Sequence, residues 1–151
     1  MKAQEKIKQL RGPHYFLSNF YPAPVEIGGI CYENNEAAFQ AQKEPERARE
    51  FVHLPPNVAK QIGRPVELRP DWEQIKLETM ADIVRAKFTQ NENLRKKLLE
   101  TGQAAIIEGN YWHDNFYGVC TCARCLNKPG KKGLNHLGRI LMEIRRELSI
   151  K

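Results

Sequence analysis

Two segments of this chain carry apolar residues at the spacing of an α-helix, and they constrain its fold more than any other feature. In residues 134–148 the apolar side chains recur every three or four positions, at Leu137, Leu141, Ile144 and Leu148. The other segment begins at Asp71, a favourable N-cap residue, and its apolar side chains are Trp72, Ile75, Ile83, Val84 and Phe88. Side chains at this spacing share one face, so the pattern predicts two long helices that each bury one side.

Shorter elements are expected around these helices. Extended segments are predicted at 14–17, 25–27 and 30–32, with Gly28-Gly29 as a tight hairpin turn between the last two. Helices are predicted at 35–43, 45–53, 57–62 and 93–101, the last ending at Gly102, and a short buried strand at 104–108. The fold class is therefore α+β, a predominantly helical single domain with a small β-sheet.

Length and composition agree with one soluble domain. A chain of 151 residues with 41% hydrophobic and 28% charged residues is large enough to bury about two-thirds of its unfolded surface. No apolar run approaches the roughly 20 residues of a membrane span, and the first six residues lack the apolar stretch of a secretory signal. We expect a cytoplasmic protein without membrane partners, in which residues 1–151 form a single domain and residues 1–13 are an N-terminal extension.

The net charge of +6 is concentrated at the C-terminus. Residues 1–119 contain 16 basic and 16 acidic residues, whereas residues 120–151 contain 8 and 2. Seven of these eight basic residues lie in a Cys-containing loop, 119–133, and on the helix that follows: Arg124, Lys128, Lys131, Lys132, Arg139, Arg145 and Arg146. Such a segment is suited to holding phosphates. The alternative is a solvated surface, with Glu143 and Glu147 pairing locally with the arginines.

The segment 36–43 places a carboxylate, an amide and an amine in a row. If it is helical, Glu36 and Lys43 share one face to within roughly 20°, and Gln40 lies between them. The Asn34-Asn35 pair supplies an N-cap, so Glu36 falls in the first turn, where the helix dipole favours a carboxylate. This row suits a polar ligand, and the alternative is a solvated helix face.

Other blocks along the chain, together with this row, resemble one known family. They are residues 16–22 (FLSNFYP), 69–72 (RPDW) with Lys76 and Met80, 87–91 (KFTQN), 110–118 (NYWHDNFYG) and 135–142 (NHLGRILM). In this order they are similar to the NADAR superfamily of N-glycosidases, named for its association with NAD and ADP-ribose. The resemblance covers roughly residues 14–148 and implies the NADAR fold. One departure is Tyr117, at a position where the family more often has Trp. The smaller ring of tyrosine leaves a smaller stacking platform.

The resemblance implies three possible functions. The family includes enzymes that remove ADP-ribose from guanine in DNA and hydrolases of early, phosphorylated riboflavin-pathway intermediates; a binder of ADP-ribose or nucleic acid without turnover is the third possibility. The C-terminal charge favours the first, an ADP-ribosyl glycohydrolase that acts like an antitoxin against a DNA-modifying toxin. For the ADP-ribosyl glycohydrolase the expected partner is ADP-ribosylated DNA. For the hydrolase of riboflavin intermediates it is a nucleotide-sugar small molecule. The sequence assigns no oligomeric state.

Cleavage of an N-glycoside explains the residue types. Breaking the C1–N bond develops positive charge on the ribose, which carboxylates near C1 stabilise, or they deprotonate the attacking water. Glu36 and Asp114 are the expected carboxylates, although Asp114 has the alternative of capping a turn. Lys43, the third expected catalytic residue, either pairs with a phosphate or attacks C1 as a neutral amine. The expected substrate-binding residues are Ser18, Asn19, Phe20, Gln40, Trp72, Trp112, Tyr117 and Gly118.

The remaining chemistry-bearing feature is a group of cysteines. Cys120, Cys122 and Cys125 follow the pattern C-x-C-x-x-C within the basic loop, and Cys31 is distant in sequence. A disulfide is disfavoured in the cytoplasm. We expect free thiols and no cofactor; the alternative is a zinc site completed by His113, His136 or Cys31.

Overall fold

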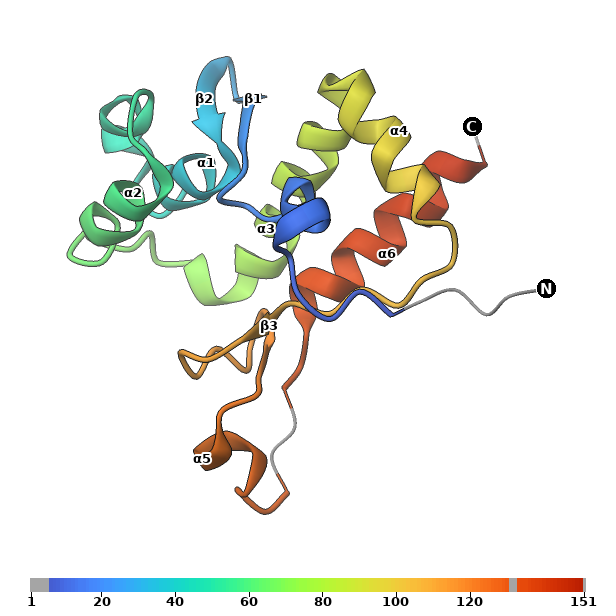
Figure 1. The fold of residues 1–151 in the computed structure, drawn as a ribbon. Helices are drawn as coiled ribbons and strands as arrows, with labels where there is room; N and C mark the ends of the chain where they lie inside the picture. Colours follow the sequence, from blue (N-terminus) through green and yellow to red (C-terminus); the bar gives the residue numbers. More distant parts are fainter. Residues whose placement is uncertain (1–5, 131–132, 151) are drawn as a thin grey trace. The chain divides into compact units, whose positions relative to one another are not determined.

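The computed structural model describes residues 6–130 and 133–150 (Figure 1). The chain divides into two compact units, one containing Asn19–Arg95 and the other containing the described residues up to Ser18 and from Lys96 onward. Lys131 and Lys132, two of the basic residues singled out above, lie outside the described residues. Within the described ranges, no helix combines the length and the apolar character needed to cross a membrane.

The unit Asn19–Arg95 begins with an antiparallel hairpin. Strand β1 (Pro22–Ile27) pairs with β2 (Ile30–Asn34), and Val25 lies opposite Tyr32. The turn residues Gly28 and Gly29 have φ angles of 57° and 80°, which glycine adopts without the steric cost that a Cβ brings. The predicted hairpin is confirmed.

Helices complete the core of the same unit. They are α1 (Asn35–Ala41), the 3-10 helix η2 (Pro45–Phe51), α2 (Pro56–Ile62) and α3 (Trp72–Gln90). Helices α1 and α3 contact the hairpin, and η2 and α2 contact α1. The side chains that lie fully inside include Val25, Tyr32, Ala37, Phe51, Ile83 and Phe88. The long helix predicted from residue 71 is confirmed, whereas the segment expected as a helix at 45–53 is a 3-10 helix.

The other unit contains η1 (Gly12–Leu17), α5 (Ala123–Leu126) and α6 (His136–Ser149), and the boundary between the units falls within α4 (Glu92–Glu100). Two short parallel strands, β3 (Gly109–Asn110) and β4 (Val119–Cys120), complete it. The predicted stripe of α6 is confirmed, because Leu137, Leu141, Ile144 and Leu148 are all buried.

Two predicted strands are wrong. The segment 14–17 belongs to η1, because Pro13 fixes a helical φ near its start and the chain closes into a 3-10 turn, with the Ser18 amide donating to the Tyr15 carbonyl. The segment 104–108 contains a single bridge, in which Ile106 pairs with Ile7. Both of these isoleucines are buried, so the described part of the N-terminal extension contributes to the core.

Candidate functional site

Helix α1 is unusual because polar side chains lie on its buried surface. Its N-cap is Asn34, whose side-chain oxygen accepts a 2.8 Å hydrogen bond from the Ala37 amide, so Glu36 stands in the first turn as expected. Every residue of the helix is buried, and Glu36 and Gln40 are only 9% and 5% exposed. The alternative of a solvated helix face is therefore wrong for these two side chains.

Lys43 does not extend this helix, which corrects the predicted boundary at residue 43. The helix ends at Ala41, and Lys43 lies in the following turn, where its amide donates to the Gln40 carbonyl over 3.2 Å. Pro45 explains the early end, since the residue before a proline is pushed out of the α conformation, and Glu44 indeed has φ −138° and ψ 85°.

The charges of Lys43 and Glu36 still interact across this turn. Burial lowers the pKa of the Lys43 amine, the Glu36 charge acts in the opposite direction, and Arg64 and Lys60 lower the pKa further. Burial disfavours the charged form because the ammonium loses hydration. The turn therefore presents a half-buried amine that loses its proton more readily than an ordinary lysine.

Glu36 and Gln40 belong to a group of four buried polar side chains. Gln40 Nε2 donates a 2.8 Å hydrogen bond to Glu36 Oε1. Asn35 Nδ2 donates to Asn19 Oδ1 over 3.1 Å, and Asn19 Nδ2 contacts the Met80 sulfur at 3.3 Å. The Glu36 amide also donates to the Asn19 carbonyl, which ties α1 to the segment before β1. Residues from three of the sequence blocks therefore meet within one unit.

Two oxygens in this group have unused hydrogen-bonding capacity. Gln40 Oε1 and Asn35 Oδ1 are buried and have no hydrogen-bond partner among the described residues. A buried acceptor without a donor costs roughly 1–3 kcal/mol, and such groups call for a structural or functional explanation. A ligand with hydroxyl or amino groups would supply the missing donors.

Gly63 determines where the Gln40 carboxamide lies, and sequence reasoning missed it. It ends α2 with φ −71°, so its backbone does not require glycine. A Cβ added there would overlap the Gln40 carboxamide. The only sequence signal was the Gly-Arg-Pro break, which indicated the end of a helix but did not indicate the contact with Gln40.

We therefore expect Gly63→Ala to displace the Gln40 carboxamide and break its bond to Glu36. Misplacing a positioning group by about 1 Å costs up to about 100-fold in rate, and we expect a loss of at least about tenfold in kcat with the fold retained. Turnover and circular dichroism measure the two effects. On a Gln40→Ala background the same substitution should add little, because most of the obstructing side chain is gone; additive losses would contradict this coupling.

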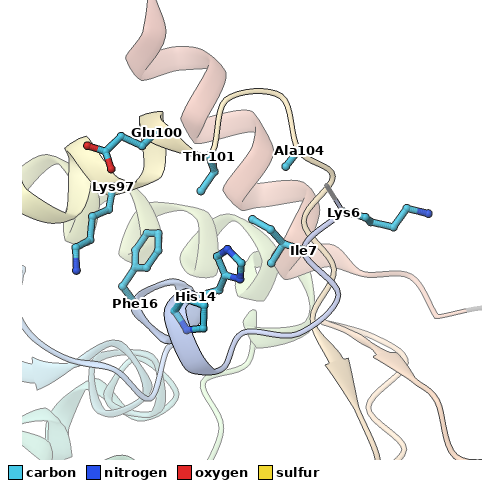
Figure 2. A pocket seen from close by; sticks show the side chains of 9 residues that line it. Lys6, Ile7, His14, Phe16, Lys97, Glu100, Thr101 and Ala104 are labelled. Carbon is cyan, nitrogen blue, oxygen red and sulfur yellow. The ribbon is translucent and has the colours of Figure 1, made fainter. Parts of the chain in front are cut away.

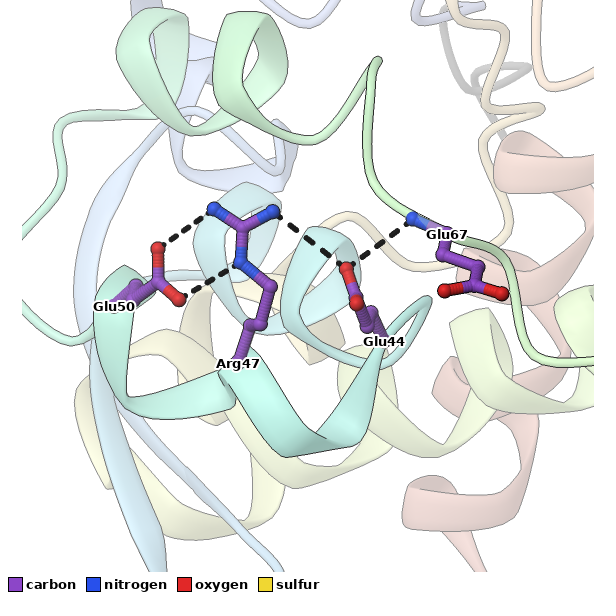
Figure 3. Close-up of polar contacts among 4 residues, drawn as sticks. All are labelled: Glu44, Arg47, Glu50 and Glu67. Atoms are coloured by element: carbon purple, nitrogen blue, oxygen red, sulfur yellow. Dashed lines mark hydrogen bonds and ion pairs between the residues drawn. The ribbon is translucent and has the colours of Figure 1, made fainter.

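The segment before α3 supports the turn that holds Lys43. The Arg69 amide donates a 2.8 Å hydrogen bond to the Lys43 carbonyl. Figure 3 shows Arg47 bridging Glu44 and Glu50, while Glu44 accepts a hydrogen bond from the Glu67 amide. These contacts link both sides of the turn to neighbouring chain segments.

Asp71 and Trp72 lie at the N-terminus of α3. Asp71 occupies the N-cap position of α3, yet its carboxylate makes no cap and binds the Arg69 guanidinium at 2.6 Å and 3.1 Å. Trp72 is 5% exposed and packs against Phe39 with ring centroids 5.2 Å apart. Trp72 therefore has a packing role, and its contact with a substrate stays a prediction, as does that of the half-buried Phe20.

Lys87 is a second amine with a lowered pKa in the unit Asn19–Arg95, and sequence analysis assigned it no role. It is 1% exposed, and burial lowers its pKa to about 7. Its ammonium nitrogen lies 5.4 Å from the Tyr21 ring centroid and 5.1 Å from that of Phe88. The sequence signal for its burial was its position among Ile83, Val84 and Phe88 in the apolar stripe of α3. A lysine in such a stripe is directed into the core, where lysines are rarely found.

The predicted residues of the other unit have clear structural roles. Asp114 Oδ1 accepts hydrogen bonds from the Phe116 and Tyr117 amides at 3.1 Å and 2.9 Å. The carboxylate thus caps a turn, which was the alternative weighed for it, and its catalytic role stays a prediction. Gly118 is buried where its backbone meets the Glu108 carbonyl, which leaves no room for a side chain.

The remaining expected contacts of this unit lie nearer the surface. Trp112 is 50% exposed, and the Arg11 guanidinium lies 5.8 Å from its ring. Tyr117 and Ser18 are half-buried, and the Tyr117 ring meets Phe116 edge-on at 4.7 Å. A hollow of about 490 Å³ in the same unit contains none of the predicted site residues (Figure 2); the side chains facing it include His14, Phe16, Lys97 and Thr101.

Comparison with known proteins places the chain in a family. The model of the NADAR domain matches residues 6–149. The chain belongs to the NADAR family. The NMR structure of the Escherichia coli protein YbiA has a TM-score of 0.78 and 32% identity, covering 99% of this chain and 88% of that one. The predicted α+β fold with a small sheet is confirmed.

Two curated relatives carry functional names. N-glycosidase YbiA of Escherichia coli is 36% identical over 89% of this chain and 81% of its own length. A riboflavin biosynthesis protein of Vibrio vulnificus is 37% identical over 89% of this chain, which spans only 36% of the Vibrio protein. These names place the NADAR chain among hydrolases that act on N-glycosyl compounds.

Proposed function

We propose that this NADAR protein hydrolyses the N-glycosidic bond of a phosphorylated intermediate of riboflavin biosynthesis. The observation that carries the proposal is the buried polar group around Glu36, in which two amide oxygens have no partner among the described residues. A carboxylate with amides beside it suits a ribose, whose hydroxyl groups donate to such oxygens. The name of the Vibrio vulnificus relative, a riboflavin biosynthesis protein, supports this substrate class.

The chemistry requires a negative group where the ribose becomes positive. Glu36 is 9% exposed, and in such an environment a carboxylate interacts with developing charge more strongly than in water. It stabilises the oxocarbenium character at C1 or takes the proton of the attacking water. Gln40 fixes the orientation of the carboxylate through the 2.8 Å hydrogen bond to Oε1.

Removal of ADP-ribose from guanine in DNA is the second candidate. Three basic residues of the C-terminal segment are exposed and available for a nucleic-acid backbone, namely Arg124, Lys128 and Arg139. Arg146 is also exposed but pairs with Glu143 at 2.8 Å, and Arg145 is only 8% exposed and donates to Thr101. The basic footprint is thus weaker than the sequence count suggests, which is why the small substrate is preferred.

Parallel incubations distinguish the two substrates. The purified protein is incubated with a phosphorylated riboflavin intermediate and, separately, with ADP-ribosylated DNA, and release of the base or of ADP-ribose is followed by chromatography. We expect cleavage of the small molecule, and none by a Glu36→Gln variant. Release of ADP-ribose from DNA at a higher kcat/KM would overturn the proposal and establish the second candidate.

A charge-neutralising variant tests the same choice independently. If the small molecule is the substrate, the double substitution of Arg124 and Lys128 by Ala should leave kcat/KM within about twofold, because surface charges of this kind contribute little. For a DNA substrate the same change should weaken binding and reduce the slope of log K against log salt by about one for each lost phosphate contact. Binding titrations at several salt concentrations measure that slope.

A further inference from the structure

Four potential metal ligands converge in the unit that contains α6. They are His113, Cys120, Cys122 and Cys125, and their ligand atoms all lie within 4.8 Å of one another. His113 Nδ1 lies 3.8 Å, 3.4 Å and 3.3 Å from the sulfurs of Cys120, Cys122 and Cys125. In a tetrahedral zinc site, with Zn–S near 2.3 Å and Zn–N near 2.0–2.1 Å, sulfur and nitrogen ligands are about 3.5 Å apart. The three distances from the imidazole nitrogen to the sulfurs, 3.3 Å to 3.8 Å, lie close to this value.

Secondary structure brings the three cysteines together. Cys120 ends β4, which runs parallel to β3; the Val119 and Thr121 amides donate 2.8 Å hydrogen bonds to the Glu108 and Asn110 carbonyls. Cys122 is the N-cap residue of α5, and its sulfur accepts from the Cys125 amide at 3.4 Å. One helical turn therefore directs both of the last two sulfurs to the same side as Cys120.

The backbone of His113 is held in a conformation that few residues adopt. Its φ is 70°, in the left-handed region. The amides on either side of it, those of Trp112 and Asp114, both donate to Asn110 Oδ1, at 3.3 Å and 3.1 Å. Asn110 itself is 1% exposed. The turn is thus built so that an unfavourable backbone angle turns the imidazole toward the sulfurs.

Asn115 supports the cluster from outside. Its Oδ1 accepts a 2.8 Å hydrogen bond from the Cys120 amide, and its Nδ2 lies 3.5 Å from the Cys125 sulfur. Donors to ligating sulfurs and contacts that orient the ligands are usual around metal centres. His136, the other histidine considered as a ligand, meets the Phe116 ring instead, at 4.7 Å.

We propose that His113, Cys120, Cys122 and Cys125 bind one structural zinc ion. Three thiolates and an imidazole in tetrahedral arrangement favour zinc over harder cations. Four protein ligands fill its coordination, so no open position is left for catalysis. The ion would fix the chain from 113 to 125, which carries Asp114 and Tyr117. This replaces the expectation of free thiols, and it holds whichever N-glycoside is the substrate.

Zinc content tests the proposal directly. The full chain, produced in zinc-supplemented medium and purified without a metal-affinity tag, should contain one zinc per molecule by mass spectrometry of the elements. Cys31→Ser is the matched control, since Cys31 is exposed on β2 in the other unit, and it should keep the zinc. Cys122→Ser should lose most of it. Equal zinc content in the two variants, or stoichiometric iron in place of zinc, would overturn the assignment.

A second variant separates ligation from folding. Asn tolerates a positive φ better than most residues, so His113→Asn should keep the turn and remove only the imidazole. Its zinc affinity should fall by more than the 10–100-fold typical of outer contacts, with unchanged circular dichroism. In the parent protein, Co²⁺ should give the intense visible absorption of a tetrahedral thiolate site. If this absorption is absent and all four cysteine thiols of the purified parent protein react freely with a thiol reagent, the site is refuted.

Discussion

Replacing Glu36 with Gln should lower turnover by at least about two orders of magnitude and leave the fold intact. The carboxylate is 9% exposed and bonded to Gln40. The variant keeps an oxygen that can accept from Gln40 Nε2, so its shape and main contact survive while the negative charge is lost. Removing one group that stabilises transition-state charge typically costs 100- to 1,000-fold in kcat, and removing a general base has a similar effect.

Steady-state kinetics with the cleaved N-glycoside measure this loss, and thermal unfolding checks the fold. Glu33→Gln is a matched control, because Glu33 is 61% exposed on β2 and its partner is the surface residue His53 at 3.6 Å. It should retain normal turnover. If Glu36→Gln also turns over at a near-normal rate, Glu36 has no part in the reaction and the carboxylate must come from elsewhere in the chain.

Local sequence signals predicted those elements whose cause is local. The hairpin follows from Gly28-Gly29, whose positive φ angles suit the turn. The start of α1 follows from Asn34, whose side chain caps the Ala37 amide. The α6 stripe follows from spacing alone. In each case a few neighbouring residues determine the conformation, so the pattern could be recognised without knowledge of the tertiary structure.

The secondary-structure predictions fail where a proline or a residue distant in sequence determines the conformation. Pro45 ends α1 before Lys43, and the segment 104–108 depends on one bridge to Ile7. The contact between Gly63 and Gln40 joins segments more than 20 positions apart, and no periodicity of the sequence indicates it. Asn135 illustrates the same limit: its left-handed backbone and its side-chain bonds to Ile106 and Glu108 are tertiary features.

The candidate site was predicted in part for the same reason. Glu36 and Gln40 share one helix, so their pairing followed from the spacing of four. That their side chains are buried, and that Asn19 and Asn35 lie beside them, depended on how the hairpin, α1 and α3 pack. Burial is what turns an ordinary surface pair into a candidate catalytic group.

Lys43 should form a covalent adduct with the substrate, and Lys43→Arg should lose nearly all activity. In this mechanism the neutral amine would attack C1, the C1–N bond would break, and the base would leave with its electron pair and take up the proton that the amine loses. Ring opening then gives an imine, which water hydrolyses to free the amine. Borohydride added during turnover reduces that imine to a secondary amine. Mass spectrometry should then show the protein heavier by the ribosyl fragment, with the adduct on Lys43.

The alternative role, pairing with a phosphate, predicts the opposite behaviour. Arginine keeps the charge, so phosphate binding and activity should largely survive the substitution, and no adduct should form. The pH profiles also differ in sign. Burial lowers the Lys43 pKa, so the neutral amine needed for attack accumulates at lower pH than in an ordinary lysine, and a covalent mechanism gains rate as pH rises through that pKa. Phosphate pairing needs the ammonium and weakens over the same interval. Retained activity in Lys43→Arg with no trapped adduct would leave attack by water, assisted by Glu36, as the mechanism.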